Sequence, residues 1–375
     1  MSDREDGTET ERTMMSRAAV PAGPVDGTLV HALVQEADGT VIQRFALDGT
    51  TVIIGRVAPA AIVLEGAAVS RRHCMVDRAG DHVTIMDLGS TNGTFVDGMR
   101  VGEPVVLADG ARIQVGPHTL RYERRRREEA LAAASLASDI AKARAYVNAL
   151  LPPPISEGPV RAAWTFQPCA ALGGDAFGYE REGDWFSAYI LDVSGHGVGS
   201  AMHSVSIMNV MRQRALPGVD PRDPAAVLAA LNDMFDMDKH HGMYFTMWYG
   251  VLHIPTRRLS YAAGGHHPAV LHAVEIGQAR PLPARGAGIG TMPGFPYRAA
   301  SVELPADARV HLFSDGAVEL AEDVREPWGM EQVTAALCGP GDWAQGPDRL
   351  YQQVRGLSGQ RPLDDDFSAI TLQLG

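Results

Sequence analysis

The chain has 375 residues, of which 45% are hydrophobic, and its formal charge at pH 7 is −12. This length exceeds what one hydrophobic core usually serves, so we expect more than one domain. The acidic balance argues against a general nucleic-acid binder, and the absence of long apolar runs argues against a transmembrane helix or a secretion signal.

Residues 1–27 are polar and largely acidic, and we expect them to form a disordered tail. The three cysteines, Cys74, Cys169 and Cys338, form no CxxC pair, so the sequence predicts neither a disulfide framework nor a structural zinc site. This cysteine usage fits a reducing cytoplasm, where we expect the protein to act.

Residues 28–122 show short alternating apolar runs separated by turn residues, which is typical of an all-β sandwich. The first two runs are LVHALVQ and VIQRFAL, and Asp38-Gly39 between them can supply the positive φ angles of a tight hairpin turn. Later runs continue the pattern as HVTIMDL, TFVDG, RIQV and HTLRYE. The sequence therefore predicts one small β domain.

Residues 123–151 are rich in alanine, lack glycine and proline, and stop before Pro152, which predicts a helix linking two domains. We interpret its basic run, Arg124 to Arg127, as a solvated helix start rather than a binding site. Apolar residues alternate by four and three positions, which fits either a homodimer through a short coiled coil or a helix packed on its own domain. These residues are Leu136, Ile140, Ala143, Val147 and Leu150.

Residues 152–375 combine strand-like and helical runs in an irregular order, and short turns such as IPTRRL favour antiparallel sheets with helices packed outside them. We therefore expect an α+β domain. The strand-like runs are VRAAWTFQP, WFSAYILDV, MYFTMWYGVLHI, RLSYAAG, RVHLFSD and FSAITLQL, and the helical runs are AMHSVSIMNVMRQRAL and PAAVLAALNDMFDM.

Acidic residues recur in this domain where hydrophobic strands meet turns. If the sheets bring the strand ends together, the carboxylates would repel one another and would need divalent cations. Oxygen ligands without cysteine or histidine favour magnesium or manganese over zinc, and two such ions can activate a water and hold a phosphoryl group. The acidic residues are Asp175, Asp192, Asp315 and the triplet Asp364, Asp365 and Asp366.

The glycine-rich run LDVSGHGVGSAM around Asp192 fits none of three better-known motifs. Ser200 stands where a dinucleotide fingerprint needs its third glycine, and the run lacks the Gly-Lys-Ser/Thr ending of a Walker phosphate loop. Ser194 lies outside a GxSxG nucleophile elbow, and we interpret His196 as structural. The carboxylate of Asp192 is then the chemically important group of this run.

The second domain, from about residue 150 to the end of the chain, resembles the SpoIIE-type branch of metal-dependent serine/threonine phosphatases, which are related to protein phosphatase 2C. The resemblance implies two antiparallel sheets flanked by helices, with a two-metal centre in a cleft. It rests on GGDAFG, LDVSGHGVGSAM, YFTMWYGVL, YAAGGHHPAVL, GIGTMPGFPY, VHLFSDGAVEL and DDDFSAITLQL, in the family's order.

By motif position, the resemblance implies that Asp175 and Asp192 bind the metals, with Asp192 bridging both ions and the carbonyl of Val193 adding an oxygen. Asp315 and Asp365 would complete the set, and Asp366 is the alternative to Asp365. A metal-activated water would attack the phosphorus of phosphoserine or phosphothreonine.

One position departs from the family pattern. Family members often carry another aspartate three residues after the one in GGD, and this chain has Gly178 there. We interpret this as a change in metal affinity or substrate choice, because Asp192 and Asp315 are both present.

Three loop motifs in the first domain contain residues suited to a phosphate: Gly55-Arg56, SRRH at 70–73 and STNGT at 90–94. Together they resemble the forkhead-associated (FHA) domain, a reader of phosphothreonine peptides. The resemblance implies that His73 holds the loops. It also implies that the phosphopeptide contacts Arg56, Ser70, Arg71, Thr91 and Asn92.

Together these features predict a bacterial signalling phosphatase that uses two Mn²⁺ or Mg²⁺ ions and docks a threonine-phosphorylated partner, such as a Ser/Thr kinase, on its FHA domain. The resemblance suggests a phosphorylated anti-anti-sigma-type protein as substrate. The alternative is a phosphopeptide-dependent scaffold with a weak or inactive phosphatase fold. The reason to consider it is Gly178, which stands where family members often carry an aspartate.

Overall fold

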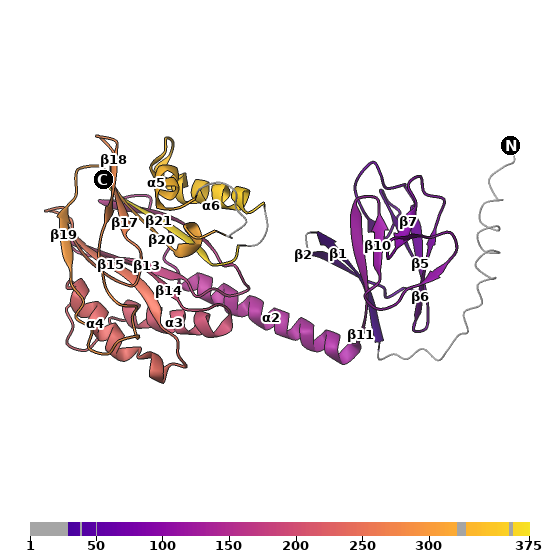
Figure 1. The fold of residues 1–375 in the computed structure, drawn as a ribbon, viewed down its shortest axis with the longest axis horizontal. Coiled ribbons are helices and arrows are strands. Elements are labelled where there is room, and N and C mark those ends of the chain that lie inside the picture. The colour runs from indigo at the N-terminus through magenta and orange to yellow at the C-terminus, as the bar shows by residue number, and fades with distance from the viewer. Residues whose placement is uncertain (1–28, 38–39, 50, 321–327, 360–362) are drawn as a thin grey trace. The chain divides into compact units, whose positions relative to one another are not determined.

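The computed structural model describes residues 29–37, 40–49, 51–320, 328–359 and 363–375. The chain divides into two compact units, Met1–Ala137 and Ser138–Gly375 (Figure 1). The predicted disordered tail and the turn residues Asp38 and Gly39 lie outside the described residues.

The first unit is a sandwich of two sheets, as the alternating pattern predicts. One sheet has the strand order β2-β1-β11-β10-β7-β8, and the other has the order β4-β3-β5-β6-β9. The predicted hairpin is present, because β1 pairs with β2 in antiparallel register. The strands are β1 (Leu29–Ala37), β2 (Thr40–Ala46), β3 (Thr51–Gly55), β4 (Ile62–Val63), β5 (Cys74–Ala79), β6 (His82–Asp87), β7 (Thr94–Val96), β8 (Met99–Arg100), β9 (Val105–Val106), β10 (Arg112–Val115) and β11 (His118–Arg126).

The boundary between the β domain and the helix differs from the prediction. Strand β11 continues to Arg126, which pairs with Leu29 of β1, and helix α2 (Arg127–Leu150) begins only at the next residue. The interpretation of Arg124 to Arg126 as a helix start was therefore wrong. The reason lies in tertiary contacts. Residues 124–126 pair with β1, and Glu123 forms ion pairs with arginines of this sheet. These contacts outweigh the local helical preference.

The apolar residues predicted to line one side of helix α2 fall into two groups that differ in burial. Val147 is buried and packs with Ala143 against the second unit's Leu172 and Ala201. Leu136 in the N-terminal half is 62% exposed. The C-terminal half thus packs on its own unit, and a homodimer through this helix remains a prediction that would have to use the N-terminal half.

The second unit contains two antiparallel sheets, with the orders β12-β21-β20-β17-β18 and β13-β14-β15-β16-β19. Helices α3 and α4 contact strands of the second of these sheets, and α6, which packs on α5, contacts strands of the first (Figure 1). This is the predicted α+β arrangement. The strands are β12 (Val160–Gln167), β13 (Ala176–Glu182), β14 (Trp185–Val193), β15 (Phe245–His253), β16 (Arg258–Gly264), β17 (Ala269–Ala273), β18 (Gln278–Leu282), β19 (Ala300–Glu303), β20 (Ala308–Phe313) and β21 (Phe367–Leu374), and the helices are α3 (Val198–Arg212), α4 (Pro224–Met234), α5 (Met330–Cys338) and α6 (Gly346–Leu357), with the short 3₁₀ turns η1 (Met237–Lys239), η2 (Asp315–Ala317) and η3 (Trp343–Gln345).

The central strands of the second unit are buried on both faces. All eight residues of β21 are buried, and β14 and β15 are buried over most of their length. Apolar residues of the two sheets share one core, which includes Ile190, Trp248 and Ile370. Such a core fixes the strand ends rigidly, and the acidic residues are at those ends.

Candidate metal centre and phosphate-binding loops

The four predicted carboxylates come from strand ends of both sheets in the second unit. Asp175 precedes β13 and Asp192 lies near the end of β14, and antiparallel pairing brings these two ends together. Asp315 follows β20 and Asp365 precedes β21, and the same pairing joins these ends. The fold therefore gathers residues that are up to 190 positions apart in the chain.

The carboxylates are close enough to change one another's ionisation. Burial raises the pKa of Asp192 to about 8, and the negative charges of Asp315 and Asp365 add to this effect. Burial and the charge of Asp192 likewise raise the pKa of Asp175 well above its usual range. A bound cation would reverse both effects, because it stabilises the ionised form.

Two oxygen atoms of the cluster support a cation site directly. Oδ1 of Asp175 and Oδ1 of Asp315 are buried and have no hydrogen-bond partner among the described residues. A buried carboxylate oxygen without a hydrogen-bond partner is costly. Such oxygens are the ligands that hard divalent cations prefer. The donor set therefore fits Mg²⁺ or Mn²⁺.

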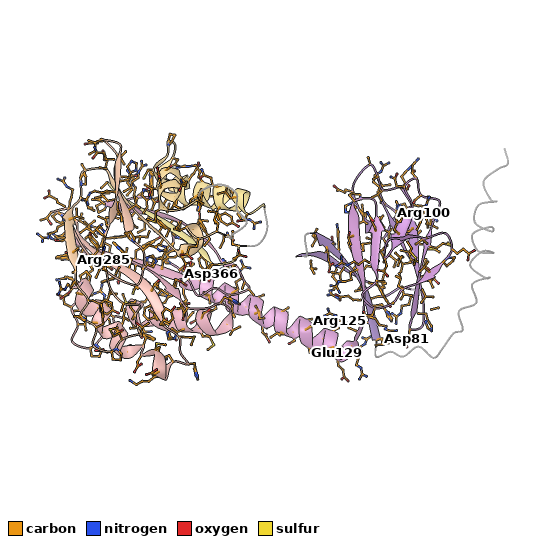
Figure 2. The ribbon with its side chains drawn as sticks, viewed as in Figure 1. Asp81, Arg100, Arg125, Glu129, Arg285 and Asp366 are labelled. Atoms are coloured by element: carbon orange, nitrogen blue, oxygen red, sulfur yellow. The ribbon has the colours of Figure 1, made fainter. Side chains whose placement is uncertain are left out.

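Asp366, the alternative to Asp365 in the predicted set, has a different environment. Its Oδ1 accepts a hydrogen bond from the amide of Cys169 at 2.8 Å, and its Oδ2 accepts one from the amide of Gly174 at 2.6 Å. A Cβ on Gly173 would lie 2.4 Å from this carboxylate. Asp366, labelled in Figure 2, thus holds the loop before Asp175, while Asp365 is exposed and available to a ligand.

Two serines that the motif analysis did not single out organise the cluster. The hydroxyl of Ser368 donates to Oδ2 of Asp175 at 2.6 Å, which orients that carboxylate. The hydroxyl of Ser314 donates to the carbonyl of Asp366 at 3.1 Å and accepts from the amide of Ser368 at 2.9 Å. Ser314 directly precedes Asp315 and Ser368 lies two residues after Asp366, so closeness in sequence to the aspartates was the available signal.

The glycine-rich run shapes the loop after Asp192. Gly195 and Gly197 have φ angles of 82° and 94°, which glycine adopts without strain. The hydroxyl of Ser194 accepts a hydrogen bond from the amide of Tyr244, so it closes the loop rather than facing a substrate as a nucleophile. The carbonyl of Val193 lies beside Gly174, where a Cβ would approach it to 2.8 Å.

A cysteine lies next to the carboxylates, although the sequence suggested a cluster of oxygen ligands alone. The sulfur of Cys169 and carboxylate oxygens of Asp365 and Asp366 lie within 4.8 Å of one another. Burial and the charge of Asp366 raise the pKa of the Cys169 thiol to about 12, so it is protonated at neutral pH. A neutral thiol is a poor ligand for Mg²⁺ or Mn²⁺, which leaves the oxygen set intact.

The three predicted phosphate-binding loops of the first unit lie side by side. The amide of Arg56 donates to the carbonyl of Ser70 at 2.9 Å, and the amide of Thr91 donates to the Ser70 hydroxyl at 3.1 Å. The side chain of Asn92 donates to the carbonyl of Ala68 at 2.8 Å. The loops that carry the exposed residues Arg56, Thr91 and Asn92 thus meet at the segment from Ala68 to Ser70.

Arg71 and His73 complete this arrangement in different ways. Arg71 is exposed, and its carbonyl lies so close to Gly55 that a Cβ there would approach it to 2.1 Å. His73 is fully buried: its Nδ1 accepts from the amide of Ser70, and its Nε2 bonds the carbonyl of Gly93 at 3.1 Å. One imidazole therefore links two of the three loops.

Comparison with known families agrees with this geometry. The family model described as stage II sporulation protein E (SpoIIE) matches residues 182–375, which is more than half of the chain. The chain belongs to the SpoIIE family. A second model, the FHA domain, matches residues 52–116 and includes all the predicted phosphate-binding positions. The SpoIIE match begins after Asp175 and includes the other three carboxylates of the predicted set.

Individual relatives cover one part of the chain each. The phosphoserine phosphatase RsbP of Bacillus subtilis is 27% identical over 44% of this chain and 41% of its own length. The oxoglutarate dehydrogenase inhibitor of Corynebacterium jeikeium is 39% identical over 21% of this chain and 54% of its own length. This chain therefore spans about half of the length of these two relatives.

A solved structure supports the fold of the second unit. The SiaA-PP2C domain of Pseudomonas aeruginosa superposes with a TM-score of 0.56 at 18% identity, over 65% of this chain and 99% of that domain. Within the part of the chain that the structure describes, no helix has the length and apolar character needed to cross a membrane.

Proposed function

We propose that this protein is a metal-dependent serine/threonine protein phosphatase that hydrolyses phosphoserine or phosphothreonine on a signalling protein. The observation that carries the proposal is the gathering of Asp175, Asp192, Asp315 and Asp365 at strand ends of two sheets, with raised pKa values for three of them. Membership of the SpoIIE family and the likeness to a phosphoserine phosphatase point to the same chemistry.

These four aspartates would hold two Mn²⁺ or Mg²⁺ ions, with Asp192 between them and the Val193 carbonyl adding an oxygen. When bound, the ions would lower the pKa of a water and offset the charge of the phosphoryl group. The chain's own polar network supports the ligands: Ser368 orients Asp175, and Asp366 fixes the backbone before it. Such outer partners keep a ligand in place when the metal arrives.

The first unit would bind a threonine-phosphorylated protein, for example a Ser/Thr kinase, through Arg56 and Ser70, with Arg71 and Thr91 assisting and Asn92 binding the peptide backbone. Docking would raise the local concentration of a phosphoprotein substrate, for which an anti-anti-sigma-type protein is our expectation. The three cysteines are unpaired, which agrees with action in the cytoplasm.

The phosphatase proposal is tested with the full chain, by Mn²⁺-dependent hydrolysis of p-nitrophenyl phosphate and of a phosphoserine peptide. We expect Asp192→Asn and Asp315→Asn to reduce the rate by more than about 100-fold, because even outer-shell partners of a metal can contribute that much. Asp364→Asn is the matched control, since Asp364 is exposed and adjacent to the cluster. Equal rates in the wild type and both cluster variants would favour the scaffold alternative instead.

Phosphopeptide binding is tested by pull-down from cell extract with the wild type, Arg56→Ala and the control Arg112→Ala, read by phosphoproteomics. Both arginines are exposed in the first unit, but only Arg56 belongs to the phosphate-binding loops. We expect threonine-phosphorylated partners to be lost with Arg56→Ala alone. Identical partners in all three samples would contradict the assignment.

A further inference from the structure

Two histidines and a cysteine cluster on the outer face of the sheet that contains β17 and β20. His272 lies on β17, His311 lies on the neighbouring strand β20, and Cys338 is the last residue of helix α5. A ring nitrogen of each histidine and the sulfur of Cys338 lie within 4.8 Å of one another. These three residues, which we call the His₂Cys cluster, share no residue with the carboxylate site.

The histidines of the cluster have unused nitrogen atoms. Nδ1 of His272 and Nε2 of His311 are buried and have no hydrogen-bond partner among the described residues. His272 and His311 are only 5% and 0% exposed, so bulk water does not satisfy these atoms. An unpaired buried polar atom is costly, and here two of them belong to neighbouring residues of one cluster, which a shared ligand would satisfy.

The ionisation of the histidines suits a metal. Burial lowers the pKa of His311 to about 3 and also lowers that of His272, so both rings are neutral at pH 7. Neutral imidazole is the form that binds metals. The other nitrogen of His311, Nδ1, is 2.9 Å from the hydroxyl of Thr371, and donation of its proton to that oxygen leaves Nε2 with a free lone pair.

We propose that the His₂Cys cluster binds a single thiophilic transition-metal ion, Zn²⁺ or Cu⁺. Two imidazole nitrogens and one thiolate are a donor set that both ions accept. In a tetrahedral zinc site the ligand atoms lie about 3.5 Å apart, so modest side-chain movement would close the observed cluster around an ion. The three residues leave a fourth position for water or another small ligand.

Charge near the cluster distinguishes the two ions. Burial raises the pKa of the Cys338 thiol to about 11, so metal binding must displace its proton to form the thiolate. Arg309 lies close enough to oppose that rise, and its Nε donates to Oε1 of Gln373 at 3.2 Å. Zn²⁺ with one thiolate keeps a positive charge beside this guanidinium, whereas Cu⁺ with one thiolate is neutral. The charge of Arg309 therefore favours Cu⁺ over Zn²⁺.

A metal at this position would join three elements. It would connect β17, β20 and the end of α5, and β20 leads within four residues of His311 to Asp315 of the carboxylate cluster. An ion that binds only the native state stabilises it by an amount that grows with the logarithm of the ion's concentration over its Kd. The site would thus fix α5 to the strand that positions Asp315, without taking part in the proposed reaction.

The test uses the full chain, stripped with a chelator, supplied with excess Mg²⁺ to occupy the carboxylate site, and then titrated separately with Zn²⁺ and Cu⁺. Elemental analysis after desalting gives the metal content, and Co²⁺ substitution gives a thiolate-to-cobalt charge-transfer band in the near ultraviolet. We expect one retained equivalent of Zn²⁺ or Cu⁺ and a cobalt band in the wild type. Both should be lost in Cys338→Ser and the metal should be lost in His272→Gln.

Cys169→Ser and Cys74→Ser are the matched controls, because Cys169 lies beside the carboxylates and Cys74 is buried in the first unit. Both controls should keep the metal and the band. A band that disappears with Cys169→Ser but persists in Cys338→Ser would overturn the assignment, as would a wild type that retains neither ion. If Cys338→Ser does not fold, as judged by circular dichroism, His272→Gln and the rise in Tm of the wild type on metal addition decide the question.

Discussion

Gly178 of β13 lies directly opposite Tyr189 of β14, and the tyrosine occupies the space where a side chain at position 178 would begin. A Cβ on Gly178 would lie 2.6 Å from both the ring and the hydroxyl of Tyr189. Side chains alternate along a strand, so Tyr189 lies on the face of β14 opposite to that of Asp192. Packing against Tyr189, on the face of the sheet opposite to Asp192, thus explains why position 178 departs from the family pattern. Gly178 is therefore weaker support for an inactive scaffold.

This contact predicts that Gly178→Ala destabilises the second unit by about 1–3 kcal/mol, the usual cost of overpacking a core. Urea unfolding with and without Mn²⁺ measures the change. The double variant Gly178→Ala/Tyr189→Ala should be more stable than the sum of the single changes predicts, because the clash is gone. Strict additivity would show that the two residues do not compete for this space.

Asp365 and Asp366 are adjacent, yet we expect their amide variants to fail in different ways. Asp366→Asn removes one of the two oxygens that accept backbone amides, which should cost about 1–3 kcal/mol of stability in the metal-free protein. Asp365→Asn removes a like charge from the cluster, so the metal-free protein should be at least as stable as the wild type but should bind Mn²⁺ more weakly.

Urea unfolding in chelator and calorimetric Mn²⁺ titration separate these two effects. Asp364→Asn serves as the control and should change neither quantity. If Asp366→Asn loses Mn²⁺ affinity while keeping full stability, Asp366 rather than Asp365 is the ligand.

The sequence predicted the elements whose local pattern agrees with their tertiary setting. The runs at β14, β16 and β21 match the observed strands residue for residue, because each is a mainly apolar segment that contains an aromatic residue and is bounded by turn residues. Strand β18 was missed because four of its five residues are exposed and one is proline, so it shows no periodicity. Its place in the sheet depends on pairing with β17, which no local pattern records.

The candidate sites, like the strands, were predictable from the sequence only in part. The aspartates were found because each belongs to a motif, and resemblance gave them roles. Hydrogen bonds that join distant positions were invisible: Asp366 holds the loop at Gly174, which is 192 positions earlier. The His₂Cys cluster was excluded in advance, because a search for CxxC pairs cannot detect ligands such as His272 and Cys338 that only the packing of α5 on the sheet brings together.

The raised pKa of Asp192 predicts how pH affects the metal-free protein. With a folded pKa of about 8 against an ordinary value of 3.8, the folded state binds more protons than the unfolded state between these values. The free energy of unfolding should therefore fall as pH rises through this window and level off above pH 8. Saturating Mn²⁺ should remove the fall, since the ion replaces the proton.

Thermal unfolding between pH 5 and 9, in chelator and in Mn²⁺, measures this dependence. Asp192→Asn in chelator should have a smaller slope than the wild type, because the variant lacks the titrating carboxyl. Parallel curves for the two proteins would show that Asp192 does not ionise in this range.

His73 and Arg56 should affect phosphopeptide binding for different reasons. His73→Ala removes the imidazole that links the Ser70 and Gly93 loops, so both the stability of the first unit and the affinity for a phosphothreonine peptide should fall. Arg56→Ala changes an exposed side chain, so affinity should fall while stability stays within about 0.5 kcal/mol of the wild type. Titration calorimetry with phosphorylated and unphosphorylated peptides, beside urea unfolding, gives both quantities. A His73→Ala variant that binds as tightly as the wild type would show that the loops keep their positions without the imidazole.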